Sequence, residues 1–228
     1  MRPEYLAVNK LSKQYGNNLV VKEVDLVIRR GEAIGLLGAN GAGKSTLIKS
    51  ILGLVHSSQG SVEINASSSY LPEQPQMPIS LSALSLLKFK CKTNRLPPSS
   101  AQQALDDVQL SKQVRNQAMR EYSKGMRQRT SLALALCGEP QLIILDEPMS
   151  GLDALGRAEI LQLLQQRKSA GTAFLMSSHI VSDMVQLCDR VLIMASGRVC
   201  ETVELHDHSL EEAKDLEVRL AQWSHRHE

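Results

Sequence analysis

The residues with the clearest chemistry form a glycine-rich run that ends in a lysine and a serine, GANGAGKS at 38–45. Dense negative charge needs closely packed donors, and glycines let consecutive backbone N–H groups converge without a Cβ clash. The spacing therefore predicts a site for the phosphates of a nucleotide. Lys44 is expected to reach the β- and γ-phosphates, and Ser45 to give an oxygen to Mg²⁺. The residues predicted to touch the nucleotide here are Gly38, Asn40, Gly41, Ala42, Gly43, Lys44, Ser45 and Thr46.

A second set of side chains is suited to metal binding and proton transfer. Asp146 and Glu147 follow an apolar run at 142–145, which predicts a buried strand that ends in two carboxylates. We expect Asp146 to hold Mg²⁺, directly or through water, and Glu147 to polarise a water for attack on the γ-phosphorus. His179 ends the strand-like run TAFLMSSH and is expected to donate a hydrogen bond to the γ-phosphate. Lys44, Glu147 and His179 are thus the predicted catalytic residues.

The order of strand and helix patterns predicts how these residues are positioned. Apolar runs alternate with helical patterns along most of the chain, as is typical of an α/β sheet. Between 75 and 121 the strand signals disappear, and prolines punctuate two helical patterns at about 81–91 and 101–110. Ser99 or Ser100 is the expected N-cap of the second pattern. We therefore expect an α/β core with an all-helical insertion.

The C-terminal segment reads as one helix. Ser209 and Glu212 form a capping-box pair at its start. The helix has an apolar stripe, which either packs on its own domain or contacts a partner. The stripe consists of Leu210, Ala213, Leu216, Leu220 and Trp223. Two H-x-H pairs, at 206–208 and 225–227, are read as an exposed tail, with metal binding as the alternative.

Further motifs make the chain resemble the nucleotide-binding subunits of ATP-binding-cassette (ABC) transporters over nearly all of its length. YSKGMRQR at 122–129 stands where this family has its signature motif, and SGLD at 150–153 looks like its D-loop. In this family the glycine-rich run at 38–45 is called the P-loop. The resemblance implies a homodimer in which each ATP lies between one subunit's P-loop and the other's signature segment. Ser123, Gly125 and Asp153 would then contact ATP across the dimer, and Tyr15 would stack on adenine.

Departures from the family pattern narrow the resemblance. The usual signature is LSGGQ, and here Tyr122, Lys124 and Met126 replace the first Leu, the first Gly and the Gln, a form typical of the type-2 exporter branch. The Mg²⁺-side residue within the run YLPEQ at 70–74 is either Glu73 or Gln74.

The resemblance also implies the fold and its subdivision. We expect a P-loop NTPase core with a β-rich N-terminal edge and a small all-helical insertion, the ABC ATPase fold. The whole of 1–228 would be one domain. Its expected parts are a core lobe at 1–74 and 131–204, a helical lobe with the signature segment at 75–130, and the C-terminal helix at 205–228.

Composition excludes several classes of protein. Of 228 residues, 43% are hydrophobic and 22% charged, which excludes a disordered chain, and the aromatic share of 3% predicts an aliphatic core. The net charge of +2 argues against a nucleic-acid partner. The apolar runs fall far short of the roughly 20 residues of a membrane helix, and no signal-peptide core is visible. The four cysteines lack metal-binding spacing and are read as reduced thiols.

The predicted function is ATP hydrolysis that drives a separate transmembrane permease, most simply in an exporter. The chain is expected to be cytoplasmic, on the inner face of the cell membrane, with membrane contact only through that permease. Importer and lipid-trafficking ATPases are the alternatives within the class. A soluble ABC protein that acts on ribosomes or DNA and a regulator without hydrolysis are the alternatives outside it.

Overall fold

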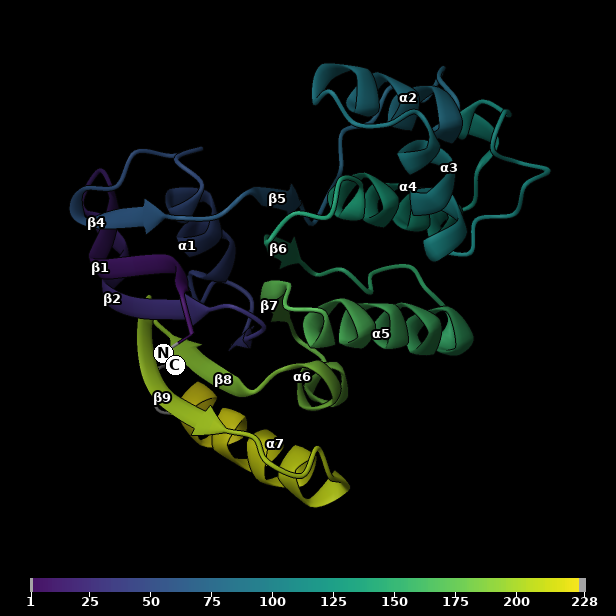
Figure 1. Cartoon of the computed structure of the whole chain (residues 1–228). Coiled ribbons are helices and arrows are strands. Elements are labelled where there is room, and N and C mark those ends of the chain that lie inside the picture. Colours follow the sequence, from purple (N-terminus) through teal and green to yellow (C-terminus); the bar gives the residue numbers. More distant parts are fainter. Residues whose placement is uncertain (1, 226–228) are drawn as a thin grey trace.

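A six-stranded sheet forms the centre of the molecule, which we describe from a computed structural model over residues 2–225 (Figure 1). The strand order is β5-β6-β7-β3-β8-β9, and all neighbours are parallel except β9, which forms a hairpin with β8. The central strands β3, β6 and β7 are buried throughout, as expected of parallel strands covered on both faces. The strand bounds are β3 (Ala33–Leu37), β5 (Ser68–Leu71), β6 (Leu142–Asp146), β7 (Ala173–Ser178), β8 (Arg190–Ala195) and β9 (Arg198–Glu204).

A three-stranded antiparallel sheet forms the predicted β-rich N-terminal edge. Its order is β2-β1-β4, with β1 (Glu4–Tyr15), β2 (Asn18–Arg29) and β4 (Gln59–Ile64). Gly16, at φ 54°, makes the tight turn between the two long strands, where a residue without a Cβ is favoured. Helix α1 (Lys44–Ile51) packs its apolar side chains with those of both sheets. The helix that starts at the P-loop is thereby fixed against the sheet that carries Asp146.

The insertion predicted between 75 and 121 is helical. It contains α2 (Ala83–Thr93), α3 (Ser99–Asp107) and a short 3₁₀ turn, η1 (Met119–Glu121), and it lies to one side of the α/β body with α4 (Lys124–Leu136) (Figure 1). The expected N-cap at Ser99 or Ser100 is wrong: both residues are inside α3, and Pro98 occupies the cap position without a side-chain hydrogen bond. Pro98 already has helical φ and ψ, so the helix starts as soon as the proline ring allows.

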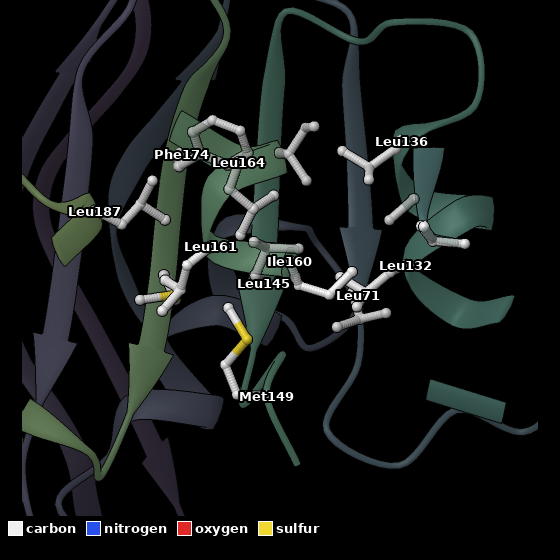
Figure 2. Packing of buried hydrophobic residues seen from close by; sticks show 14 of the residues in the cluster. Leu71, Leu132, Leu136, Leu145, Met149, Ile160, Leu161, Leu164, Phe174 and Leu187 are labelled. Carbon is white, nitrogen blue, oxygen red and sulfur yellow. The ribbon is translucent and has the colours of Figure 1, made fainter. Parts of the chain in front are cut away.

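Helix α4 joins the insertion to the core. It runs through residue 130, where the sequence places the end of the helical lobe, and continues to Leu136 without a break. Its side chains Leu132 and Leu136 pack in the same aliphatic cluster as Leu145 of β6 (Figure 2). The signature segment is therefore rigidly connected to the strand that carries Asp146.

Two further helices complete the α/β body. Helix α5 (Ala154–Ser169) and helix α6 (Val181–Leu187) lie side by side on the face of the large sheet opposite to α1 (Figure 1). Figure 2 shows Leu164 of α5 beside Phe174 of β7 and Ile160 of α5 beside Leu145 of β6. Phe174 is among the largest fully buried side chains in a core that is otherwise mainly aliphatic, as the low aromatic content predicts.

The C-terminal helix α7 (Leu210–His225) packs on α6 and β8 of its own chain. The predicted capping box is present, because Ser209 Oγ accepts from Glu212 N–H and Glu212 Oε2 accepts from Ser209 N–H. The apolar stripe is wrong at Leu210, which is 82% exposed, whereas Leu216 is fully buried. Leu210 occupies the first turn, before the helix reaches the surface that the rest of the stripe covers. Within residues 2–225, no helix combines the length and apolarity needed to cross a membrane.

Candidate nucleotide-binding site

The P-loop follows β3 directly and leads into α1, as the sequence predicts. Two of its glycines are required by close backbone contacts. A Cβ on Gly38 would lie 2.3 Å from the Met194 carbonyl oxygen, and one on Gly43 would lie 2.7 Å from the Val20 carbonyl oxygen. Gly43 also has a φ of 104°, which residues with a side chain rarely adopt. The loop is therefore held between β2 and β8 with its backbone donors at the start of α1, where the helix dipole favours an anion.

The side chain of Lys44 is mostly buried and extends back into the loop that precedes it. Its Nζ donates to the carbonyl oxygens of Gly38 at 2.6 Å and of Ala39 at 3.2 Å. Burial lowers the pKa of Lys44, and the carboxylates of Glu147 and Asp146 oppose this shift. An anion that arrives at the loop would therefore find a cation held only by neutral carbonyls.

Asp146 forms the end of β6 and connects the P-loop to β7. Its Oδ1 lies 3.3 Å from Ser45 Oγ and accepts a 2.5 Å hydrogen bond from Ser177 Oγ. Ser177 Oγ in turn accepts from the backbone N–H of Glu147 at 3.1 Å. Ser177 is a site residue that the sequence reasoning missed. The signal was its place two residues before His179, which puts it opposite Asp146 in the parallel register of β6 and β7.

Glu147 and His179 meet just beyond the ends of these strands. Glu147 Oε2 lies 2.9 Å from His179 Nδ1, although the residues are 32 positions apart in the chain. The backbone of Glu147 has a φ of 51°, in the left-handed region that a non-glycine residue adopts only when its surroundings impose it. Here its N–H is held by both Ser177 Oγ and the Ser177 carbonyl oxygen. The fold thus holds Glu147 in a backbone conformation of higher energy, which places its carboxylate next to His179.

A pocket of about 380 Å³ gathers most of the predicted nucleotide and metal residues. Glu73 lines it with Asp146 and Glu147, whereas Gln74 is not among the lining residues. Val20 also lines it, a second residue that the sequence reasoning missed because nothing in β2 distinguishes it from a core valine. From the P-loop the lining residues are Asn40, Gly41, Ala42, Gly43, Lys44, Ser45 and Thr46.

Tyr15 lies at the end of β1 and does not line that pocket. Its ring is 47% exposed, and Lys13 Nζ lies 4.5 Å from the ring centroid. An exposed ring is available for stacking, and the role in adenine binding stays a prediction.

The predicted signature and D-loop residues lie together, away from the pocket. Ser123 Oγ caps α4 by accepting from Met126 N–H, and a Cβ on Gly125 would lie 3.3 Å from the Gly151 carbonyl oxygen. Asp153 Oδ1 caps α5 by accepting from Gly156 N–H. None of these three residues lines the pocket of its own subunit, and their contact with ATP stays a prediction.

Two arginines in the segment 115–129 form ion pairs within the subunit. Arg115 is buried and pairs with Asp106, and Arg129 pairs with Glu159, so both cations are used inside the subunit. Within the described part of the chain, no group of three or more His, Cys, Asp or Glu side chains could hold a metal ion. His227 of the second H-x-H pair lies outside the described residues.

Comparison with known proteins agrees with this geometry. A family model described as ABC transporter matches residues 21–150. An uncharacterised ABC transporter ATP-binding protein of Nostoc sp. is 38% identical over 78% of this chain and 58% of its own length. The bacitracin transport ATP-binding protein BcrA of Enterococcus faecalis is 34% identical over 89% of this chain and 70% of its own length. The chain thus spans little more than half of the first of these relatives.

Among solved structures, an ATP-binding subunit of an ABC transporter superposes with a TM-score of 0.83 at 30% identity. The match covers 95% of this chain and 99% of the other. The predicted fold class, an α/β cassette with an antiparallel N-terminal sheet and a helical insertion, is confirmed.

Proposed function

Because this chain belongs to the ABC transporter family as an ATP-binding subunit, we propose that it hydrolyses ATP to drive a separate transmembrane permease. The observation that carries the proposal is the 2.9 Å contact between Glu147 and His179 beside the P-loop pocket. A cassette that does not hydrolyse ATP would not need a carboxylate on a strained backbone at this place.

The side chains divide the chemistry among them. The P-loop N–H groups and Lys44 bind the phosphates and stabilise the charge that develops during transfer. Glu147 orients the attacking water and accepts its proton, while His179 holds the carboxylate and donates to the γ-phosphate. Ser177 fixes both carboxylates, since it binds the side chain of Asp146 and the backbone of Glu147.

The donor set of the pocket fits Mg²⁺. Ser45 Oγ and Asp146 Oδ1 lie together, Glu73 lines the same pocket, and all three offer the hard oxygen ligands that Mg²⁺ prefers beside phosphates. When bound, the cation would neutralise charge on the β- and γ-phosphates. The carboxylate of Glu73 supports its assignment over Gln74 as the Mg²⁺-side residue.

Substitutions at 73 and 74 separate these two residues. Glu73→Ala should raise the Mg²⁺ concentration needed for half-maximal ATPase activity about tenfold, because an oxygen ligand or its water partner is lost. Glu73→Gln should retain most of the affinity through its amide oxygen. Gln74→Ala is the control and should titrate like the wild type. A Mg²⁺ requirement that moves with Gln74 and not with Glu73 would reverse the assignment.

A homodimer would complete the site. The pocket of one subunit is lined by the P-loop and the acidic pair, with His179 in contact with Glu147, but it lacks Ser123 and Gly125, which lie at the start of α4. A helix N-terminus with a capping serine and a glycine is suited to bind phosphate held by another subunit. We therefore assign two ATP molecules to the interface of two copies.

Transport is supported by the family and by the bacitracin transport relative, and the YSKGMRQR form of the signature favours an exporter. The chain would lie on the inner face of the membrane through its permease alone. The decisive experiment is affinity purification of the tagged chain from detergent-solubilised membranes, with identification of co-purifying proteins. A polytopic membrane protein is the expected partner, whereas ribosomes or DNA-associated proteins would contradict the proposal.

A further inference from the structure

Helices α5 and α6 each begin at a segment that serves the ATP site. Helix α5 starts directly after Asp153 of the D-loop, and α6 starts two residues after His179. The two helices lie side by side in Figure 1. One ion pair joins their first turns: Arg157 Nη2 lies 2.7 Å from Asp183 Oδ1.

Asp183 is unusually dependent on this partner. Its side chain is only 2% exposed, and its second oxygen, Oδ2, has no hydrogen-bond partner among the described residues. A buried carboxylate is costly unless a cation compensates it, so the contact with Arg157 decides where this side chain can stay. Because α6 is only seven residues long, the position of Asp183 also sets the orientation of the helix start next to His179.

Arg157 is equally well tied to the D-loop. Its backbone N–H donates to the Asp153 carbonyl oxygen at 2.9 Å, within the turn that the Asp153 side chain caps. Arg157 thus links Asp153, through Asp183, to the helix that follows His179. His179 in turn contacts Glu147.

We propose that the Arg157–Asp183 ion pair is a positioning contact for hydrolysis, which keeps His179 aligned with Glu147 according to the state of the D-loop. This inference rests on the proposed function, since the D-loop changes state only if a second copy binds across ATP. Neither residue touches the nucleotide pocket. Their effect on catalysis is exerted through His179.

The opposite end of the same helix supplies a matched control. Arg167 of α5 pairs with Asp107 at 2.6 Å and with Glu139 at 2.7 Å, and its side chain is buried to a similar degree as that of Arg157. The Arg167–Asp107 pair joins α5 to α3 and not to a catalytic segment. Loss of either arginine should lower the stability of the fold, but only the loss of Arg157 should misplace His179.

The test compares steady-state ATPase kinetics and thermal melts of full-length variants. Arg157→Ala should lower kcat about ten- to a hundredfold with the KM for ATP nearly unchanged, since a small misplacement of catalytic groups has effects of this size. Arg157→Lys should restore much of kcat, because the observed contact uses a single nitrogen that an ammonium can replace. Arg167→Ala should lower the Tm and leave kcat near the wild-type value.

Two results would overturn the inference. One is a wild-type kcat for Arg157→Ala. The other is a loss of kcat that is not specific to the ion pair. In that case Arg167→Ala would reproduce the loss, or Arg157→Lys would not restore kcat, and a general loss of stability would explain the lower kcat. The proposed function is checked separately by ATP-dependent dimerisation of Glu147→Gln. The kcat comparison tests whether the ion pair positions His179, and the dimerisation test decides the proposed function, so the two failures are distinguishable.

Discussion

Glu147→Gln is expected to reduce ATP turnover by about 10²- to 10⁴-fold and to trap an ATP-bound dimer. The amide has the shape of the carboxylate but cannot accept the proton of the attacking water. Binding of ATP depends on the P-loop and on Lys44, which the substitution leaves intact. Two subunits would therefore close around ATP without the hydrolysis that lets them part. Size-exclusion chromatography with ATP and Mg²⁺ measures the dimer, and phosphate release measures turnover.

Glu63→Gln is a suitable control, because it makes the same chemical change at a residue that is exposed on β4. It should remain active, and no ATP-stabilised dimer should accumulate. A Glu147→Gln variant that still turns over ATP at the wild-type rate would show that another residue is the base. A monomeric Glu147→Gln protein with ATP and Mg²⁺ would contradict the two-subunit site.

Residues that act through contiguous sequence were predictable. The P-loop consists of eight consecutive residues, and Asp146 ends β6 with Glu147 directly after it. Because β3, β6 and β7 are adjacent parallel strands, their carboxyl ends meet at one edge of the sheet. The sequence predicts His179 at the end of its own strand, and the structure brings its side chain to 2.9 Å from that of Glu147.

Residues that act through pairing between segments were not predictable in the same way. Ser177 becomes a site residue only because its register sets it opposite Asp146, and register is a property of the folded sheet. Val20 lines the pocket from β2 and looks like any strand valine in the sequence. Local signals failed at Leu210 too, since the helical period says which residues share a face but not where the neighbouring surface ends.

The choice between Glu73 and Gln74 shows the same limit at the scale of one residue. The run YLPEQ leaves β5 with a proline, after which the alternation of the strand no longer fixes which side chain faces the sheet edge. In the structure Glu73 lines the pocket, and it also contributes to the field that opposes the lowered pKa of Lys44. A carboxylate at this place adds negative charge to a site that must accept phosphates, which makes a bound cation more important.

Lys44→Ala is expected to lower kcat/KM for ATP by about 10²- to 10³-fold, the size of effect seen when one donor to a developing charge is removed. The reason is visible in the present contacts. Lys44 Nζ is held by the carbonyl oxygens of Gly38 and Ala39, at the start of the loop that binds phosphate, and its burial makes the ammonium costly there. A bound phosphate would give Lys44 Nζ an anionic hydrogen-bond acceptor in place of these neutral carbonyl oxygens.

The substitution can be separated from damage to the fold by a second lysine on the same helix. Lys49 lies in the last turn of α1 and is exposed, so Lys49→Ala removes an equal charge away from the pocket. Turnover and the rise in Tm on adding ATP and Mg²⁺ should both persist in Lys49→Ala and both be lost in Lys44→Ala. Undiminished hydrolysis in Lys44→Ala would mean that the backbone N–H groups alone hold the phosphates. In that case the helix start, and not the ammonium, would be the main phosphate-binding element of this cassette.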